Sequence, residues 1–113
     1  MKNKMEHYLP VKGISINECF QGRRFKTKKY NAFIEEMLYT MPKQKMIKGM
    51  VRIGIAFSLK SILRSDLDNL LKPVIDCVVK KGWIEDDRFI QSIEAHKILG
   101  DKEEIRIKIE SLK

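Results

Sequence analysis

Cysteine and histidine are scarce in this chain, and it contains no long hydrophobic run. The two cysteines, Cys19 and Cys77, lie far apart and indicate neither a disulfide scaffold nor a cysteine-rich zinc site. With His7 and His96 as the only histidines, zinc chemistry is nearly excluded. No apolar segment approaches the roughly 20 residues that a bilayer-spanning helix requires, so we expect no membrane partner.

The amino-terminal segment, Met1–His7, turns polar where a signal peptide would turn apolar, so we expect a soluble, cytoplasmic protein. The 113 residues fit a single domain over 1–113 and leave no room for a second one. Apolar residues make up 43% of the chain, which is enough for a real core. The charged fraction of 34% is high, but the composition is not that of a disordered chain.

Positive charge is concentrated in the first half of the chain. The whole sequence has 23 Lys+Arg against 15 Asp+Glu, which gives a net charge of +8. Residues 1–60 hold 13 of these cations and 4 of the acids, whereas residues 61–113 hold 10 cations and 11 acids. The first half therefore indicates a surface that binds a polyanion, and the acids of the second half need another explanation.

Apolar periodicity predicts six elements in the order β-α-β-α-β-β. In chain order they are His7–Leu9, Thr27–Met41, Met50–Leu59, Asp68–Lys80, Phe89–Leu99 and Glu104–Glu110. This order describes a small α/β (α+β) sandwich, in which helices cover one face of a mixed four-stranded sheet.

Three local signals add detail to this fold. Thr27 is the predicted N-cap of the first helix, whose apolar residues fall on one face. Pro73 conflicts with the second helix, so we expect a kink there or a non-helical first turn. The segment Gly100–Glu103 is predicted to be a hairpin turn between the last two strands.

Acidic residues gather in two short segments of the second half. Asp66-Leu67-Asp68 places two carboxylates two residues apart, where an extended backbone would point them the same way. Lys72 follows one helical turn later, and Glu85-Asp86-Asp87 comes after the helix. Mg²⁺ and Mn²⁺ favour carboxylate ligands, and a nearby lysine can stabilise charge on a transferring phosphoryl group. These residues supply such a site if the fold brings the two segments together.

Each of these residues also has a purely structural explanation. Asp66 or Asp68 can be an ordinary N-cap, and Asp68 with Lys72 can be an ordinary surface ion pair. Glu85–Asp87 can be a solvated turn, and Asp76 is typical of a helix surface charge. One competing nuclease signature, an acid followed by lysine two residues later, is absent from the sequence. Spacing alone leaves the structural explanations open.

The segment from Gly22 to Tyr30 contains five cations and no acid. It leads from a loop into a helix N-terminus, whose backbone N–H groups form a phosphate site together with Arg and Lys. A solvated basic face is the alternative, but the charge bias of the first half favours contact with DNA or RNA. The predicted DNA-binding residues are Asn17, Arg23, Arg24, Lys26, Lys28 and Lys29.

Two segments resemble the RusA family of Holliday junction resolvases, which occur in bacteria and their phages. The first contains Ser15-Ile16-Asn17, Gly22-Arg23-Arg24 and Thr27-x-x-Tyr30. The second contains Asp66-Leu67-Asp68-Asn69-Leu70-Leu71-Lys72-Pro73, then Asp76, and then Gly82-Trp83-Ile84-Glu85-Asp86-Asp87. The resemblance spans roughly residues 9–98, and the second segment is its more specific part.

The resemblance implies a small homodimer that cuts four-way DNA junctions with Mg²⁺, for which Mn²⁺ can substitute. Asp66, Asp68 and Asp87 match the metal-binding aspartates of the family, and Lys72 matches its essential lysine. Asp86 is the adjacent candidate for the third aspartate. Because a four-way junction is two-fold symmetric, a two-fold dimer supplies one site for each of two symmetric cuts.

The leading hypothesis is therefore a crossover junction endodeoxyribonuclease that acts in DNA recombination and repair. One alternative is a non-catalytic DNA-binding module of a prophage, in which the acids only cap and solvate. Another is a catalytically worn prophage relic that still binds junctions. The complete set of Asp66, Asp68, Lys72 and Asp87 argues against the relic.

Overall fold

The structure is a computed structural model that describes residues 3–18, 20–21, 25–63 and 65–112. The long elements are the strands β1 (Lys4–Leu9), β4 (Val51–Leu59), β5 (Ile90–Leu99) and β6 (Glu104–Ser111) and the helices α1 (Lys28–Thr40) and α2 (Leu67–Lys81). Short elements are the 3-10 helices η1 (Ile16–Glu18) and η2 (Asp87–Phe89) and the strands β2 (Phe20–Gln21) and β3 (Phe25–Lys26).

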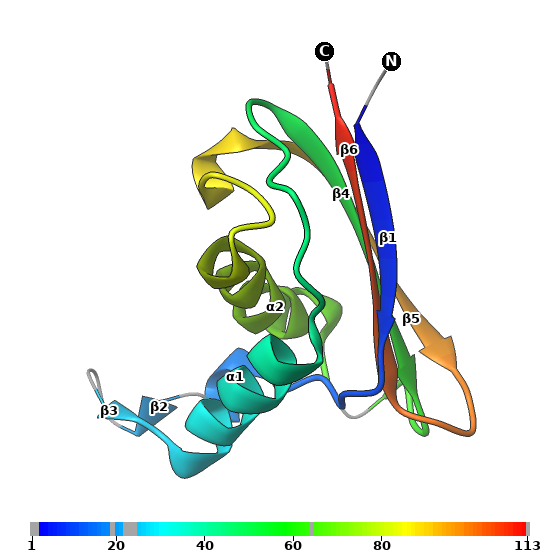
Figure 1. The fold of residues 1–113 in the computed structure, drawn as a ribbon. Coiled ribbons are helices and arrows are strands. Elements are labelled where there is room, and N and C mark those ends of the chain that lie inside the picture. Colours follow the sequence, from blue (N-terminus) through cyan, green and yellow to red (C-terminus); the bar gives the residue numbers. More distant parts are fainter. Residues whose placement is uncertain (1–2, 19, 22–24, 64, 113) are drawn as a thin grey trace.

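The long strands form one mixed sheet in the order β1-β6-β4-β5, and both helices lie on one face of it (Figure 1). The predicted fold class is thus confirmed, and the long elements follow one another as expected. The short strands β2 and β3 pair with each other and lie beyond α1, on the side away from the sheet (Figure 1). They and η1 were not predicted, because such short elements carry no periodic pattern.

Strand β6 lies inside the sheet and pairs antiparallel with both β1 and β4. Its alternating residues Ile105, Ile107 and Ile109 all face the helices and are completely buried. The strand ends at Ser111, one residue beyond the predicted Glu110. A one-sided pattern of this kind results when one face of a strand packs on a core and the other faces water.

The predicted hairpin between the last two strands is wrong, because β4 lies between them. Strand β5 pairs parallel with β4 on one side, and β6 pairs with β4 on the other. The connection 100–103 crosses the end of β4, where the Gly100 N–H donates to the Leu59 carbonyl at 2.9 Å. A Cβ atom at Gly100 would lie 2.5 Å from Ser58 Oγ, so a larger residue here would force the Ser58 side chain to move.

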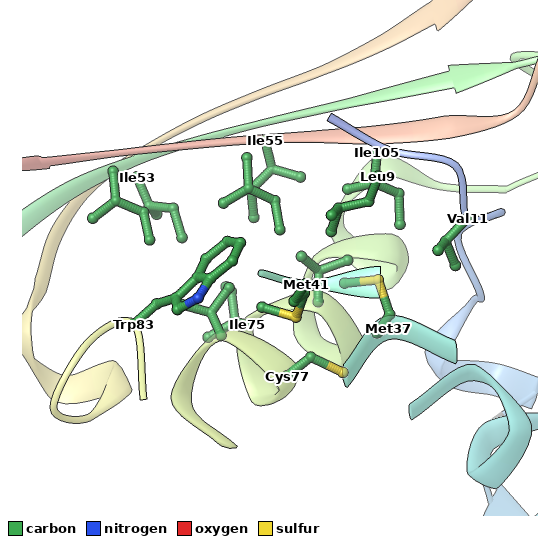
Figure 2. Close-up of a cluster of buried hydrophobic side chains, with 14 of the residues drawn as sticks. Leu9, Val11, Met37, Met41, Ile53, Ile55, Ile75, Cys77, Trp83 and Ile105 are labelled. Carbon is green, nitrogen blue, oxygen red and sulfur yellow. The ribbon is translucent and has the colours of Figure 1, made fainter. Parts of the chain in front are cut away.

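The core lies between the sheet and the two helices (Figure 2). Thr27 caps α1 as predicted by accepting a hydrogen bond from the Tyr30 N–H, and Tyr30, Phe33 and Met37 are buried. Trp83 is also completely buried, and its indole N–H donates to the Pro42 carbonyl at 3.1 Å. This bond fixes the chain directly after α2, and therefore the position from which the acidic run begins.

Helix α2 begins at Leu67 and continues through Pro73, so the predicted non-helical first turn is wrong. Proline costs a helical hydrogen bond, but here its ring is buried against the core. The helix ends at Gly82, whose φ of 79° is left-handed and whose N–H bonds to the Val78 and Val79 carbonyls. This sharp end brings the following acidic residues back alongside the helix.

Within the described residues, neither helix is long and apolar enough to cross a membrane. Cys77 is buried on α2, whereas Cys19 lies outside the described residues.

Candidate active site

Asp66 stands at the N-cap position of α2, as one structural explanation proposed. Its backbone is extended, with φ −74° and ψ 139°, but its side chain makes no capping hydrogen bond. Among the described residues, no side-chain partner of its exposed carboxylate occurs either. Capping therefore does not account for the carboxylate, which is available to a ligand.

Asp68 lies in the exposed first turn of α2, where a carboxylate interacts favourably with the helix dipole. The expectation that Asp66 and Asp68 point the same way assumed extended backbone. That assumption is wrong, because α2 already begins at Leu67, so the backbone is extended at Asp66 and helical from Leu67 onward. The proposed ion pair between Asp68 and Lys72 also does not form among the described residues, since Lys72 binds other acids.

The Lys72 ammonium lies between two carboxylates. Its Nζ is 3.1 Å from Asp76 Oδ1, one turn further along α2, and 3.4 Å from Asp87 Oδ2. The hydrogen bond to Asp76 is the main reason why the pKa of Lys72 is raised above its ordinary value, and Asp87 acts in the same direction. Partial burial opposes this effect, but the net result favours the charged ammonium.

The three acids after α2 have three different partners. The Glu85 carboxylate accepts a hydrogen bond from the Gly49 N–H at 2.7 Å, which fixes the loop before β4. Asp86 caps η2 by accepting from the Asp87 N–H at 2.8 Å, and it also pairs with Arg88 at 3.6 Å. Only Asp87 contacts Lys72. The run is therefore not a merely solvated turn, and the geometry favours Asp87 over Asp86 as the acid that belongs to the site.

The carboxylate oxygens of Asp66, Asp68 and Asp87 are suitable ligands for Mg²⁺ or Mn²⁺. Within one chain, however, the fold does not bring these three side chains together. In the part of the chain that the structure describes, no three acidic, histidine or cysteine side chains are placed to hold a metal ion. Asp66 lines a cavity of about 370 Å³ together with Asn17 and Asn69. Asp87 lines a different cavity of about 340 Å³. The fold thus joins Asp87 to Lys72 without gathering Asp66, Asp68 and Asp87 into one group.

The basic segment lies where α1 begins. Lys26 ends β3, and Lys28 and Lys29 are the first two residues of α1. Lys28 is exposed, whereas Lys29 pairs with Glu18 at 3.4 Å. The predicted DNA contacts Arg23 and Arg24 lie outside the described residues. Asn17, the remaining predicted contact, lines the same cavity as Asp66.

Two residues of the site were not assigned to it from the sequence. Tyr30 is buried on α1, and its hydroxyl donates to Asp76 Oδ2 at 3.2 Å. Asp76 was interpreted as a surface charge, yet its side chain is only 32% exposed and binds both Tyr30 and Lys72. The four-residue spacing between Lys72 and Asp76 was a visible signal, whereas the contact with Tyr30 depends on how the two helices pack.

Comparison with known proteins shows which family the chain resembles. The crossover junction endodeoxyribonuclease rusA of Enterobacteria phage HK97 is 29% identical over 85 residues, which covers 73% of this chain and 71% of that protein. The family model of the endodeoxyribonuclease RusA matches residues 16–110, a range that includes both acidic segments and the basic segment. Because this match covers most of the chain, the protein belongs to the RusA family of endodeoxyribonucleases.

Proposed function

We propose that this protein is a Mg²⁺-dependent endonuclease that resolves four-way DNA junctions by paired, symmetric cuts. The observation that carries the proposal is the Lys72 ammonium held between Asp76 and Asp87. Lys72 lies on α2, which has Asp66 at its N-cap position and Asp68 in its first turn. The name of the phage relative adds the substrate, since it is a crossover junction enzyme. A role in DNA recombination and repair inside the cell is part of the proposal, as is substitution of Mn²⁺ for Mg²⁺.

Lys72 acts in this site as a fixed positive charge. Because its pKa is raised, the ammonium is charged at neutral pH and cannot accept a proton from water. A cation beside the scissile phosphate stabilises the charge that develops on the transferring phosphoryl group. The carboxylates of Asp66 and Asp68 are exposed toward solvent and suited to a divalent ion. When bound, such an ion would supply Lewis-acid stabilisation and a water of lowered pKa.

The basic segment and the acidic site share one surface. Lys26 and Lys80 line the cavity of about 340 Å³ that also contains Asp76 and Asp87. A DNA strand held at the start of α1 can therefore extend to Lys72 without crossing the molecule. A second copy of the chain would provide the second cut, because a two-fold dimer matches the symmetry of the junction.

The test of this function is a mobile four-way junction labelled on each strand and incubated with the protein. We expect paired nicks at symmetric positions in Mg²⁺ and none in EDTA. A linear duplex with the sequence of one arm is the matched control and should stay intact. Tight junction binding without nicks in either Mg²⁺ or Mn²⁺ would instead support the non-catalytic DNA-binding module.

Replacing Lys26 and Lys28 of the basic segment should weaken DNA binding, because contacts with phosphates are lost. For Lys26→Ala/Lys28→Ala we expect the slope of log affinity against log salt to fall by about 2, since each phosphate contact contributes about 0.9. The control is Lys4→Ala/Lys108→Ala, which removes the same charge from the sheet face opposite the helices. An equal change in slope for both variants would contradict the assignment of this surface.

A further inference from the structure

We propose that Asp76 and Tyr30 are positioning residues that hold the Lys72 ammonium in place for cleavage. The inference rests on the proposed function, because it concerns the lysine of that same site. Asp76 contacts Lys72 directly, and Tyr30 acts through Asp76. Neither residue is assigned a contact with the DNA.

The two oxygens of the Asp76 carboxylate have different partners. Oδ1 lies 3.1 Å from Lys72 Nζ, and Oδ2 accepts the hydrogen bond from the Tyr30 hydroxyl at 3.2 Å. A carboxylate held at both oxygens cannot rotate away from the ammonium without losing a bond. Tyr30 therefore fixes the orientation of Asp76, and Asp76 fixes the end of the Lys72 side chain.

Helix propensity alone does not explain this pair. In isolated helices an acid four residues before a lysine stabilises better than the reverse order, and here the lysine comes first. The tertiary contact from α1 compensates, because the buried Tyr30 brings its hydroxyl to Asp76 from the neighbouring helix. The pair is thus maintained by the packing of α1 against α2.

Lys72 needs such a partner because its side chain is long, flexible and 51% exposed. Its second contact, Asp87, is longer at 3.4 Å and lies on a carboxylate that is 48% exposed. Asp87 can exchange Lys72 for another ligand while Asp76 still holds the lysine. The two acids therefore have different roles, since Asp76 positions Lys72 and Asp87 faces the reacting region.

Tyr30 also connects this contact to the DNA-binding segment. Its N–H donates to the Thr27 hydroxyl at 3.1 Å, and the Lys26 ammonium lies 5.3 Å from the centre of its ring. The residue that orients Asp76 is therefore packed against the start of the basic segment. A strand bound there lies next to a lysine that is already in position.

The test combines Asp76→Asn and Tyr30→Phe with Lys72→Ala in double-mutant cycles. Single-turnover cleavage of bound junction should fall about 10- to 100-fold for Asp76→Asn and about 3- to 10-fold for Tyr30→Phe. Junction affinity should stay within about two-fold of the wild type. In the Lys72→Ala background, neither change should slow cleavage further. Additive losses in that background would overturn the proposal, because they would show a general structural effect.

Controls of matched chemistry are available in the same chain. Tyr39→Phe removes a hydroxyl from an exposed tyrosine of α1, and Asp101→Asn neutralises an exposed aspartate in the turn before β6. Both should cleave at the wild-type rate. Thermal unfolding of all variants identifies any loss of activity that only follows loss of folded protein.

A measurement without cleavage separates this proposal from the proposed function. After reductive ¹³C-methylation, the Lys72 resonance is identified by its absence in Lys72→Arg, and it should shift in Asp76→Asn and in Tyr30→Phe. If the resonance shifts while the wild type cuts no junction, the proposed function is contradicted. The contact between Asp76 and Lys72 then exists without a catalytic role. If the resonance stays unchanged in an active enzyme, the positioning proposal alone is contradicted.

Discussion

Asp68→Asn is expected to abolish junction cleavage and to leave junction binding intact. The substitution keeps the shape of the side chain and removes one negative charge from the proposed metal site. Loss of a charged ligand at such a site should reduce single-turnover cleavage by about 10³-fold or more. Binding should be equal or slightly tighter, because a carboxylate that repels the DNA phosphates has been neutralised.

The fold should tolerate this change. Asp68 is exposed, and it has no hydrogen-bond or ion-pair partner among the described residues. Its favourable interaction with the helix dipole is worth about 0.3–1 kcal/mol, so thermal stability should fall only slightly. Binding is measured in EDTA and cleavage in Mg²⁺, with Asp101→Asn as the control for loss of one exposed acid. Cleavage at the wild-type rate would show that Asp68 is not part of the metal site.

The parts of the fold that follow local patterns could be predicted from the sequence. The face formed by Tyr30, Phe33 and Met37 predicted α1, and the alternation of Ile105, Ile107 and Ile109 predicted β6. These patterns report which side of an element packs on a core, and they are independent of the order in which strands pair. For that reason the elements were identified while one of their pairings was wrong.

The position of β5 illustrates what local patterns do not contain. Its apolar residues lie on both faces, with Ile93 46% exposed and Ile98 47% exposed, as at a sheet edge. The short connection after it resembles a hairpin turn, yet it crosses the end of β4 instead. Gly100 is compatible with a hairpin turn and with a connection that crosses the end of β4. Which of the two forms depends on which strand lies in the middle of the sheet. The more regular alternation of β6 suits that middle position better.

For the candidate site, the sequence predicted the types of residue better than it predicted the contacts between them. Asp87 and Lys72 were candidates for one site on the condition that the fold brings their segments together, and the left-handed Gly82 at the end of α2 is the local feature that allows their contact. The structural explanation that paired Lys72 with Asp68 is wrong, and spacing could not decide it because Asp68 and Asp76 are both four residues from Lys72. Asp76 has the additional contact with Tyr30, and that contact arises from helix packing rather than from spacing.

Lys72→Ala is expected to slow cleavage by about 10²- to 10³-fold with little loss of stability. The variant removes the cation that stabilises developing charge at the phosphate. The ion pairs of Lys72 are half-exposed, and pairs of this kind contribute at most about 1 kcal/mol to folding. Lys108→Ala, an exposed lysine on the sheet face opposite the helices, is the control for loss of one lysine. If activity falls only in proportion to folded protein, Lys72 has a structural role instead.

Comparing the pH dependence of cleavage by the wild type and by Lys72→Ala shows whether the charged or the neutral form of Lys72 acts. The raised pKa means that the ammonium persists through the neutral and mildly alkaline range and is lost only above the ordinary lysine value. The stability that its ion pairs contribute is likewise complete below that value and is lost as the pH rises through the folded-state pKa. The ratio of wild-type to Lys72→Ala cleavage rates should therefore be constant between about pH 7 and 9. A lysine that acted as a general base would give a ratio that rises about tenfold per pH unit over this range, because only its minor neutral form would be active.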